Sequence, residues 1–186
     1  SGALRISLID DFRSIVEACN TLNIKIIVVP LVDNGGLESQ LQEDKLVNIL
    51  LQERQNLVAL GVKIAFESDY TAADLKRFIK RLPSDSFGIN YDIGNSASLG
   101  YEANQEFAHY GDRVINIHVK DRPLGGTTVP LGEGDADFET VFKNLSEYKY
   151  QGNYILQTAR ASNGDHSDVL SYYKSMTESW VYNHGS

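Results

Sequence analysis

Two short apolar stretches each end in a residue that can bind a metal or move a proton. Asp92 lies near the end of residues 87–95, and His118 lies 26 residues further on, near the end of residues 114–122. Each stretch has the length and character of a buried β-strand. Neighbouring parallel strands end at the same edge, so we expect the carboxylate and the imidazole to face one cavity. The alternative is that Asp92 caps a helix and that His118 is a hydrogen-bonded core histidine.

Two more polar side chains end other predicted strands. Glu67 lies 25 residues before Asp92, and Gln157 lies 39 residues after His118. If all four strands are parallel, their carboxyl ends bring the four side chains together. Oxygen ligands with one imidazole nitrogen suit a divalent ion, namely manganese, magnesium, cobalt or zinc. The competing interpretations are a helix-capping or solvated carboxylate for Glu67 and a hydrogen bond to neighbours for Gln157.

Strands and helices alternate along the chain. Apolar runs predict strands at 24–32, 62–67, 87–95, 114–122 and 153–158. Capping and stop signals predict helices that start at Asp10 or Asp11, span 38–60 before Gly61, run from Thr71 towards Pro83, span 101–110, start at Asp137, and start near Ser167. This order implies a parallel sheet with right-handed crossovers.

The alternation of side chains separates a barrel from an open sheet. The face that carries Glu67, Asp92, His118 and Gln157 also takes Lys63, Ala65, Gly88, Asn90 and Asn116. The opposite face takes Ile64, Phe66, Ile89, Tyr91, Ile115, Ile117, Tyr154 and Leu156. Because a doubly wound sheet is apolar on both faces, one small or polar face favours the interior of a (β/α) barrel.

The number of strands predicts a partial barrel. Five strands are fewer than the eight of a TIM barrel, and 186 residues are fewer than the roughly 250 typical of one. The chain also begins with a helix, as if N-terminal strand–helix units were absent. We therefore expect residues 1–186 to form a single α/β barrel domain of TIM type with five units, truncated at its N-terminus. Its unpaired edge strands, near Ile24 and Asn153, favour a fragment, an open barrel or pairing with another copy.

The composition limits the classes of partner. With 42% hydrophobic and 23% charged residues, the chain is typical of a soluble globular protein. A net charge of −8 argues against a nucleic-acid surface, although a few local cations suffice for a small phosphorylated ligand. No apolar run approaches the roughly 20 residues of a membrane span. Because the single cysteine, Cys19, cannot form an internal disulfide and no signal peptide is visible, we expect a cytoplasmic protein.

Four stretches resemble the sugar phosphate isomerase/epimerase family of the xylose-isomerase-like TIM barrel superfamily. They are Phe-Glu-Ser at 66–68, Tyr-Asp-Ile-Gly-Asn at 91–95, Ile-His-Val-Lys-Asp-Arg at 117–122, and Val-Pro-Leu-Gly-Glu-Gly-Asp at 129–135 followed by Asp137 and Phe138. The last two are the most specific. The resemblance covers nearly the whole chain and corresponds to the last five of the eight units of that fold.

The resemblance implies an isomerase or epimerase of carbohydrate metabolism with a divalent metal held by Glu67, Asp92, His118 and position 157. The family normally has a glutamate at that last position, where this chain has Gln157. Related epimerases are expected to use carboxylates at 67 and 157 on opposite faces of the substrate, while the metal polarises the carbonyl and stabilises the enediolate. An amide cannot accept a proton, so only Glu67 remains as a base. This predicts aldose–ketose isomerisation rather than epimerisation, unless His166 or Glu133 replaces the lost carboxylate.

Other polar residues are expected to contact a sugar or sugar phosphate. Lys120 and Arg122 follow the predicted histidine ligand, and charge and resemblance suggest that Arg122 holds substrate oxygens or a phosphate; a surface salt bridge is the alternative. Glu133, Arg160 and His166 are further candidates. Two other functions stay open, namely a non-catalytic barrel fragment and a metal-dependent phosphodiesterase of the apurinic endonuclease type. The latter needs further metal ligands and a basic face, which four histidines and a charge of −8 do not favour.

Overall fold

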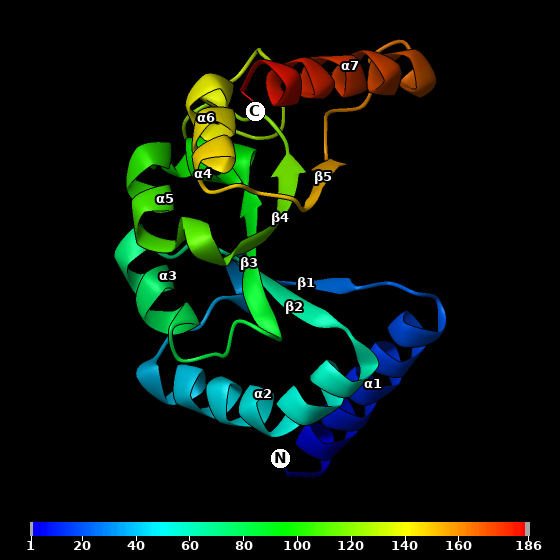
Figure 1. Cartoon of the computed structure of the whole chain (residues 1–186), viewed down its shortest axis with the longest axis vertical. Helices are drawn as coiled ribbons and strands as arrows, with labels where there is room; N and C mark the ends of the chain where they lie inside the picture. Colours follow the sequence, from blue (N-terminus) through cyan, green and yellow to red (C-terminus); the bar gives the residue numbers. More distant parts are fainter. Residues whose placement is uncertain (1, 185–186) are drawn as a thin grey trace.

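A computed structural model describes residues 2–184 and contains one five-stranded sheet (Figure 1). The strands are β1 (Ile26–Leu31), β2 (Lys63–Ser68), β3 (Phe87–Asp92), β4 (Val114–Val119) and β5 (Asn153–Leu156). Their spatial order follows the chain, and each neighbouring pair is parallel. This is the arrangement of consecutive units in a (β/α) barrel, and it confirms the predicted partial barrel with five strands.

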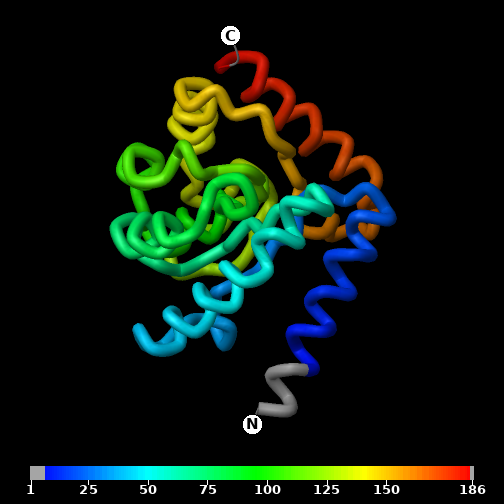
Figure 2. Tube along the Cα trace, turned by 60° about the horizontal axis from the view of Figure 1, so that its bottom comes forward, coloured from blue at the N-terminus to red at the C-terminus, as the bar shows by residue number. Residues whose placement is uncertain are grey.

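The helices connect and cover the strands. They are α1 (Gly2–Thr21), α2 (Gln40–Leu60), α3 (Ala72–Ile79), α4 (Ile93–Leu99), α5 (Ala103–Tyr110), α6 (Phe138–Glu147) and α7 (His166–His184), with short 3₁₀ segments at Asp33–Gly35 and Gly111–Arg113. Helices α3, α5 and α6 lie on one side of the sheet, and the two ends of the chain lie on opposite sides of the molecule (Figures 1 and 2). Among residues 2–184, no helix has the length and apolarity required to cross a membrane.

Most of the predicted helix boundaries rest on local signals that the structure confirms. Gly61 adopts φ +65° and ends α2, a conformation that glycine reaches without strain. The side chain of Thr71 accepts a hydrogen bond from the backbone N–H of Asp74 at the start of α3. Asp137 does the same for Thr140 at the start of α6. These caps satisfy backbone donors that the first helical turn leaves unpaired.

The first helix differs from its prediction. It begins at Gly2, so Asp10 and Asp11 lie within it and cap nothing. The segment 3–9 contains no glycine or proline, and therefore nothing in it stops the helix from extending towards the N-terminus. Val16 is buried, but Ile15 is 53% exposed, so the helix buries only part of its apolar surface.

The two faces of the sheet differ in polarity as predicted. Ile64, Phe66 and Ile117 are fully buried in the apolar core, whereas the other face carries buried asparagines. Ile115 is the exception, because the register shifts between Ile89 and Asn90 and leaves Ile115 as an extra residue on β4. Its side chain lies over Gly88, where an added Cβ would come 2.6 Å from Cγ1 of Ile115. Ile115 therefore lies on the polar face, and its predicted assignment to the apolar face is wrong.

Candidate metal centre

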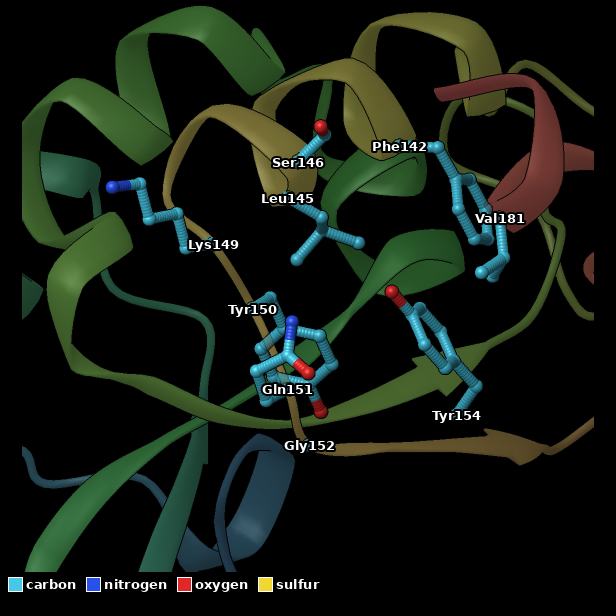
Figure 3. A pocket seen from close by; sticks show the side chains of 9 residues that line it. All are labelled: Phe142, Leu145, Ser146, Lys149, Tyr150, Gln151, Gly152, Tyr154 and Val181. Atoms are coloured by element: carbon cyan, nitrogen blue, oxygen red, sulfur yellow. The ribbon is translucent and has the colours of Figure 1, made fainter. Parts of the chain in front are cut away.

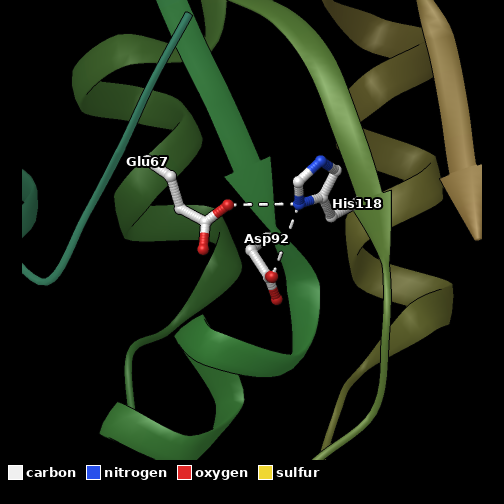
Figure 4. Close-up of side chains that lie close together, drawn as sticks. All are labelled: Glu67, Asp92 and His118. Atoms are coloured by element: carbon white, nitrogen blue, oxygen red, sulfur yellow. Dashed lines mark ion pairs between the residues drawn. The ribbon is translucent and has the colours of Figure 1, made fainter. Parts of the chain in front are cut away.

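Glu67, Asp92 and His118 converge at the carboxyl ends of β2, β3 and β4 (Figure 4). Nδ1 of His118 lies 3.1 Å from Oε2 of Glu67 and 3.7 Å from Oδ2 of Asp92. One ligand atom from each residue lies within 4.8 Å of the other two. The side chains of Glu67 and His118 are each 12% exposed and that of Asp92 is 1% exposed, so the three groups meet in a partly shielded place.

The chemistry of these three groups fits a divalent metal. Nδ1 of His118 is buried and has no hydrogen-bond partner of good geometry, although two carboxylates lie beside it. A cation among the three groups would bind this nitrogen and offset the two negative charges. Two carboxylates and one imidazole are ligands that manganese, zinc and cobalt accept readily, and magnesium less so.

The carboxylates also control the charge of His118. Burial disfavours the imidazolium, but the neighbouring carboxylates of Asp92 and Glu67 outweigh this effect and raise the pKa of His118 to about 9. Without a metal, the ring therefore carries a proton at neutral pH and balances part of the negative charge. Metal binding to Nδ1 must displace that proton.

Asp92 caps a helix, as the alternative interpretation of the sequence had it, and also faces the other two side chains. Its Oδ1 accepts a hydrogen bond of 2.8 Å from the backbone N–H of Asn95 and thereby caps α4. Its other oxygen, Oδ2, faces His118. A carboxylate has enough lone pairs for both contacts, so helix capping does not compete with metal binding.

Two asparagines that were not predicted as site residues bind Glu67, and a third binds one of them. Asn95 donates from Nδ2 to Oε1 of Glu67, and Asn90 donates from Nδ2 to Oε2, both at 2.8 Å. Asn116 in turn donates to Oδ1 of Asn90 at 2.6 Å. The sequence places Asn90 and Asn116 on the polar face. Only the strand register shows that Asn116 is hydrogen-bonded to Asn90 and Asn90 to Glu67. The signal for Asn95 was its position three residues after a capping aspartate.

Lys120 contacts one of the three converging side chains directly, and Arg122 reaches them through Asn95. Nζ of Lys120 is 3.3 Å from Oδ2 of Asp92 and 3.1 Å from Oε1 of Gln157. Lys120 therefore connects Gln157, which follows β5, to Asp92 at the end of β3. Arg122 donates from Nη1 to Oδ1 of Asn95 at 2.8 Å and from Nε to the carbonyl of Gly126 at 2.9 Å. Among the described residues Arg122 forms no ion pair, so the salt bridge considered from the sequence does not form there.

The remaining predicted substrate contacts lie apart from these groups. Glu133 is exposed in the loop between β4 and α6. Arg160 and His166 are exposed after β5, where they line a cavity of about 300 Å³ together with Gln157. Nδ1 of His166 accepts a hydrogen bond from the backbone N–H of Ala161. Within residues 2–184, no hydrogen bond or ion pair joins these three side chains to Glu67, Asp92 or His118.

A separate cavity of about 550 Å³ lies between α6, α7 and the segment that leads into β5 (Figure 3). Its walls are Phe142, Leu145, Ser146, Lys149, Tyr150, Gln151, Gly152, Tyr154 and Val181. None of the three converging ligands contributes to it, and its lining carries no carboxylate. The candidate metal-binding side chains therefore lie at the ends of β2, β3 and β4, outside this cavity.

Comparison with curated proteins finds sugar-phosphate epimerases. The putative L-ribulose-5-phosphate 3-epimerase SgbU of Escherichia coli K12 is 33% identical over 89 residues, which is 44% of this chain and 31% of that protein. The L-ribulose-5-phosphate 3-epimerase UlaE of Salmonella paratyphi A is 33% identical over 72 residues, 38% of this chain and 25% of that enzyme. The matched part of the chain thus spans a third or less of the length of these relatives.

Solved structures share the fold at low identity. A xylose isomerase domain protein from Planctomyces limnophilus has a TM-score of 0.79 and 19% identity, covering 95% of this chain and 66% of that chain. The IolI protein with a bound zinc atom has a TM-score of 0.77 and 19% identity, covering 98% and 72%. A xylose isomerase-like TIM barrel protein from Mycobacterium smegmatis in complex with magnesium has a TM-score of 0.72 and 15% identity, covering 93% and 67%.

The family match covers almost the whole chain. Residues 2–176 match the family described as xylose isomerase-like TIM barrel, in agreement with the strand order and the predicted resemblance. This chain therefore belongs to the xylose isomerase-like TIM barrel family.

Proposed function

We propose that the chain binds a divalent metal through Glu67, Asp92 and His118 and isomerises or epimerises a sugar or sugar phosphate. The observation that carries the proposal is the convergence of these three side chains, with Nδ1 of His118 buried between two carboxylates. The names of the curated relatives, L-ribulose-5-phosphate 3-epimerases, support a phosphorylated ketose as substrate. Manganese, cobalt, zinc and magnesium are the candidate metals, and the zinc and magnesium bound by two structural neighbours support this set.

Glu67 is the proposed base. A divalent metal at this centre would polarise the carbonyl of the bound sugar and stabilise negative charge on its oxygen. Glu67 takes the proton from the carbon beside that carbonyl, leaving an enediolate, and returns it to the former carbonyl carbon, while the proton of the neighbouring hydroxyl moves to the former carbonyl oxygen. The amide donors on both carboxylate oxygens support this role, because they fix the orientation of the carboxylate.

Lys120 and Arg122 are the proposed contacts for substrate oxygens or a phosphate. Lys120 lies beside Asp92 and Arg122 beside Asn95, which binds Glu67, and their positive charge suits an anionic sugar phosphate. Glu133, Arg160 and His166 are proposed for the outer part of the substrate, because all three are exposed at this end of the sheet.

Gln157 determines which reaction is expected. An ammonium can only donate, so the oxygen of this amide faces Lys120, and its Nε2 group remains to donate to a substrate hydroxyl. Without a carboxylate there, a proton moves on the Glu67 face alone, which favours aldose–ketose isomerisation over two-base epimerisation. A glutamine at position 157, where the family normally has a glutamate, also favours the second candidate function, a metal-binding barrel without proton-transfer activity.

Solvent exchange tests the proposed base. The chain loaded with manganese is incubated with L-ribulose 5-phosphate in D₂O, and mass spectrometry follows deuterium uptake into the sugar. We expect uptake with the wild type and a loss of at least about 100-fold in Glu67→Gln, the usual contribution of a general base. Glu147→Gln, a carboxylate exposed on α6, serves as the control and retains the wild-type rate. No uptake by a metal-loaded wild type would favour the barrel without activity.

A further inference from the structure

We propose that Asn95 is a positioning residue that fixes the Glu67 carboxylate relative to the two cations Lys120 and Arg122. The inference rests on the proposed function, in which Glu67 is both ligand and base. One amide side chain makes all three contacts, and its backbone N–H also binds Asp92. Asn95 thus touches two of the three proposed ligands and both proposed substrate cations.

The donor half of the amide orients Glu67. Nδ2 of Asn95 donates to Oε1 at 2.8 Å, while Asn90 donates to Oε2 at the same distance. Oε2 is the oxygen that faces Nδ1 of His118. With a donor on each oxygen, the carboxylate cannot rotate without breaking a hydrogen bond, so the metal-facing oxygen keeps its direction. Removing the donor of Asn95 leaves only Asn90 to oppose that rotation.

The acceptor oxygen of the amide binds both cations. Oδ1 of Asn95 accepts from Nζ of Lys120 at 3.1 Å and from Nη1 of Arg122 at 2.8 Å. A neutral acceptor can hold two neighbouring positive groups without neutralising either of them. Asn95 therefore holds both cationic groups at a fixed distance from the Glu67 base, and Lys120 is in addition paired with Asp92.

The position of Asn95 is itself restrained. It lies in the first turn of α4, which Asp92 caps, and the next residue, Ser96, hydrogen-bonds the buried carboxylate of Glu106. The preceding residue, Gly94, packs so closely on β4 that an added Cβ would come 2.7 Å from Cγ of Lys120 and 3.0 Å from its carbonyl carbon. The helix cannot shift away from Lys120 without breaking these contacts, so Asn95 is held at a fixed place between base and cations.

Cobalt binding tests this role without requiring activity. The full chain and its Asn95→Ala variant are titrated with Co²⁺, and the visible spectrum of the bound ion reports the ligand geometry. We expect a roughly 10–100-fold loss of affinity in Asn95→Ala, the usual cost of removing a group that orients a metal ligand. We also expect an altered cobalt spectrum, because Glu67 is free to turn. A residue that only stabilised α4 would lower the unfolding temperature and leave the spectrum unchanged.

A matched control and a second variant make the result decisive. Asn104 on α5 accepts a hydrogen bond of 2.8 Å from Asn144, away from the three ligands, so Asn104→Ala should bind cobalt as the wild type does. Asn95→Asp keeps an oxygen for Lys120 and Arg122 but has no N–H for Glu67, so its cobalt spectrum should also change. Wild-type spectra and affinity in Asn95→Ala, or a wild-type spectrum in Asn95→Asp, would overturn the inference. A wild-type chain that binds no cobalt would contradict the proposed function first.

Discussion

At the scale of single residues, the four predicted ligands separate into two groups. Glu67, Asp92 and His118 meet within contact distance, whereas Gln157 contacts Lys120. The spacing of the sequence predicted which strands end together, because the carboxyl ends of parallel strands share one edge. The spacing could not predict the contacts of Asn95. They depend on a short helix and on how closely that helix packs against the residues that follow β4.

His118 makes the stability of the metal-free chain depend on pH. Its pKa of about 9 in the folded chain lies above the ordinary 6.5, so folding favours the protonated ring. This contribution is fully present below about pH 6.5 and is lost as the pH rises through 9, with an upper limit of about 3 kcal/mol. Urea unfolding of the metal-free wild type and His118→Gln should therefore show a difference that shrinks between these pH values. A difference independent of pH would contradict the assigned charge.

Gln157 offers a gain-of-function test. Gln157→Glu places a carboxylate beside Lys120 and supplies the second proton acceptor that epimerisation needs. We expect the metal-loaded variant to interconvert the 3-epimers of a ketose phosphate at least about 100-fold faster than the wild type, the usual contribution of a general base. Chromatographic separation of the epimers measures the rate. No gain with metal bound would argue against the role assigned to position 157.

At the scale of elements, α4 is the largest departure from the prediction. Its seven residues include glycine, asparagine and two serines, which have poor helix propensity, and no apolar periodicity marks it. The helix forms because Asp92 caps it and because Ile93 is buried in the core. Tertiary packing thus overrides local preference in the segment that carries Asn95.

The loop after β4 depends on another carboxylate, that of Asp121, which is fully buried. It accepts hydrogen bonds from the backbone N–H groups of Gly132, Gly134 and Ala136, at 2.8, 3.0 and 3.2 Å. We expect Asp121→Ala to destabilise the chain by about 2–4 kcal/mol in urea unfolding, because three partly buried backbone donors lose their acceptor. Asp112→Ala, at an exposed aspartate, is the control and should change stability little. Equal stability of the two variants would show that the loop does not need this carboxylate.

At the scale of the whole molecule, the sequence predicted the architecture well. The alternation of one polar and one apolar face indicated a barrel, and the parallel sheet in chain order agrees with it. The extra residue on β4 could not be predicted, because it changes only the face of the sheet on which Ile115 lies. Each edge strand pairs with a single neighbour within residues 2–184, and association of these edges with another copy stays a prediction.

The central claim is that Glu67, Asp92 and His118 bind one divalent ion, and a metal-binding titration tests it most directly. The chain is stripped of metal and titrated calorimetrically with Mn²⁺ or Zn²⁺, next to His118→Ala and His109→Ala. His109 lies on α5 with its ring against the carbonyl of Gln105, away from the three ligands. The account predicts one bound ion per chain for the wild type and His109→Ala, and at least about 100-fold weaker binding for His118→Ala. A wild type without binding, or a His118→Ala variant with undiminished affinity, would contradict it.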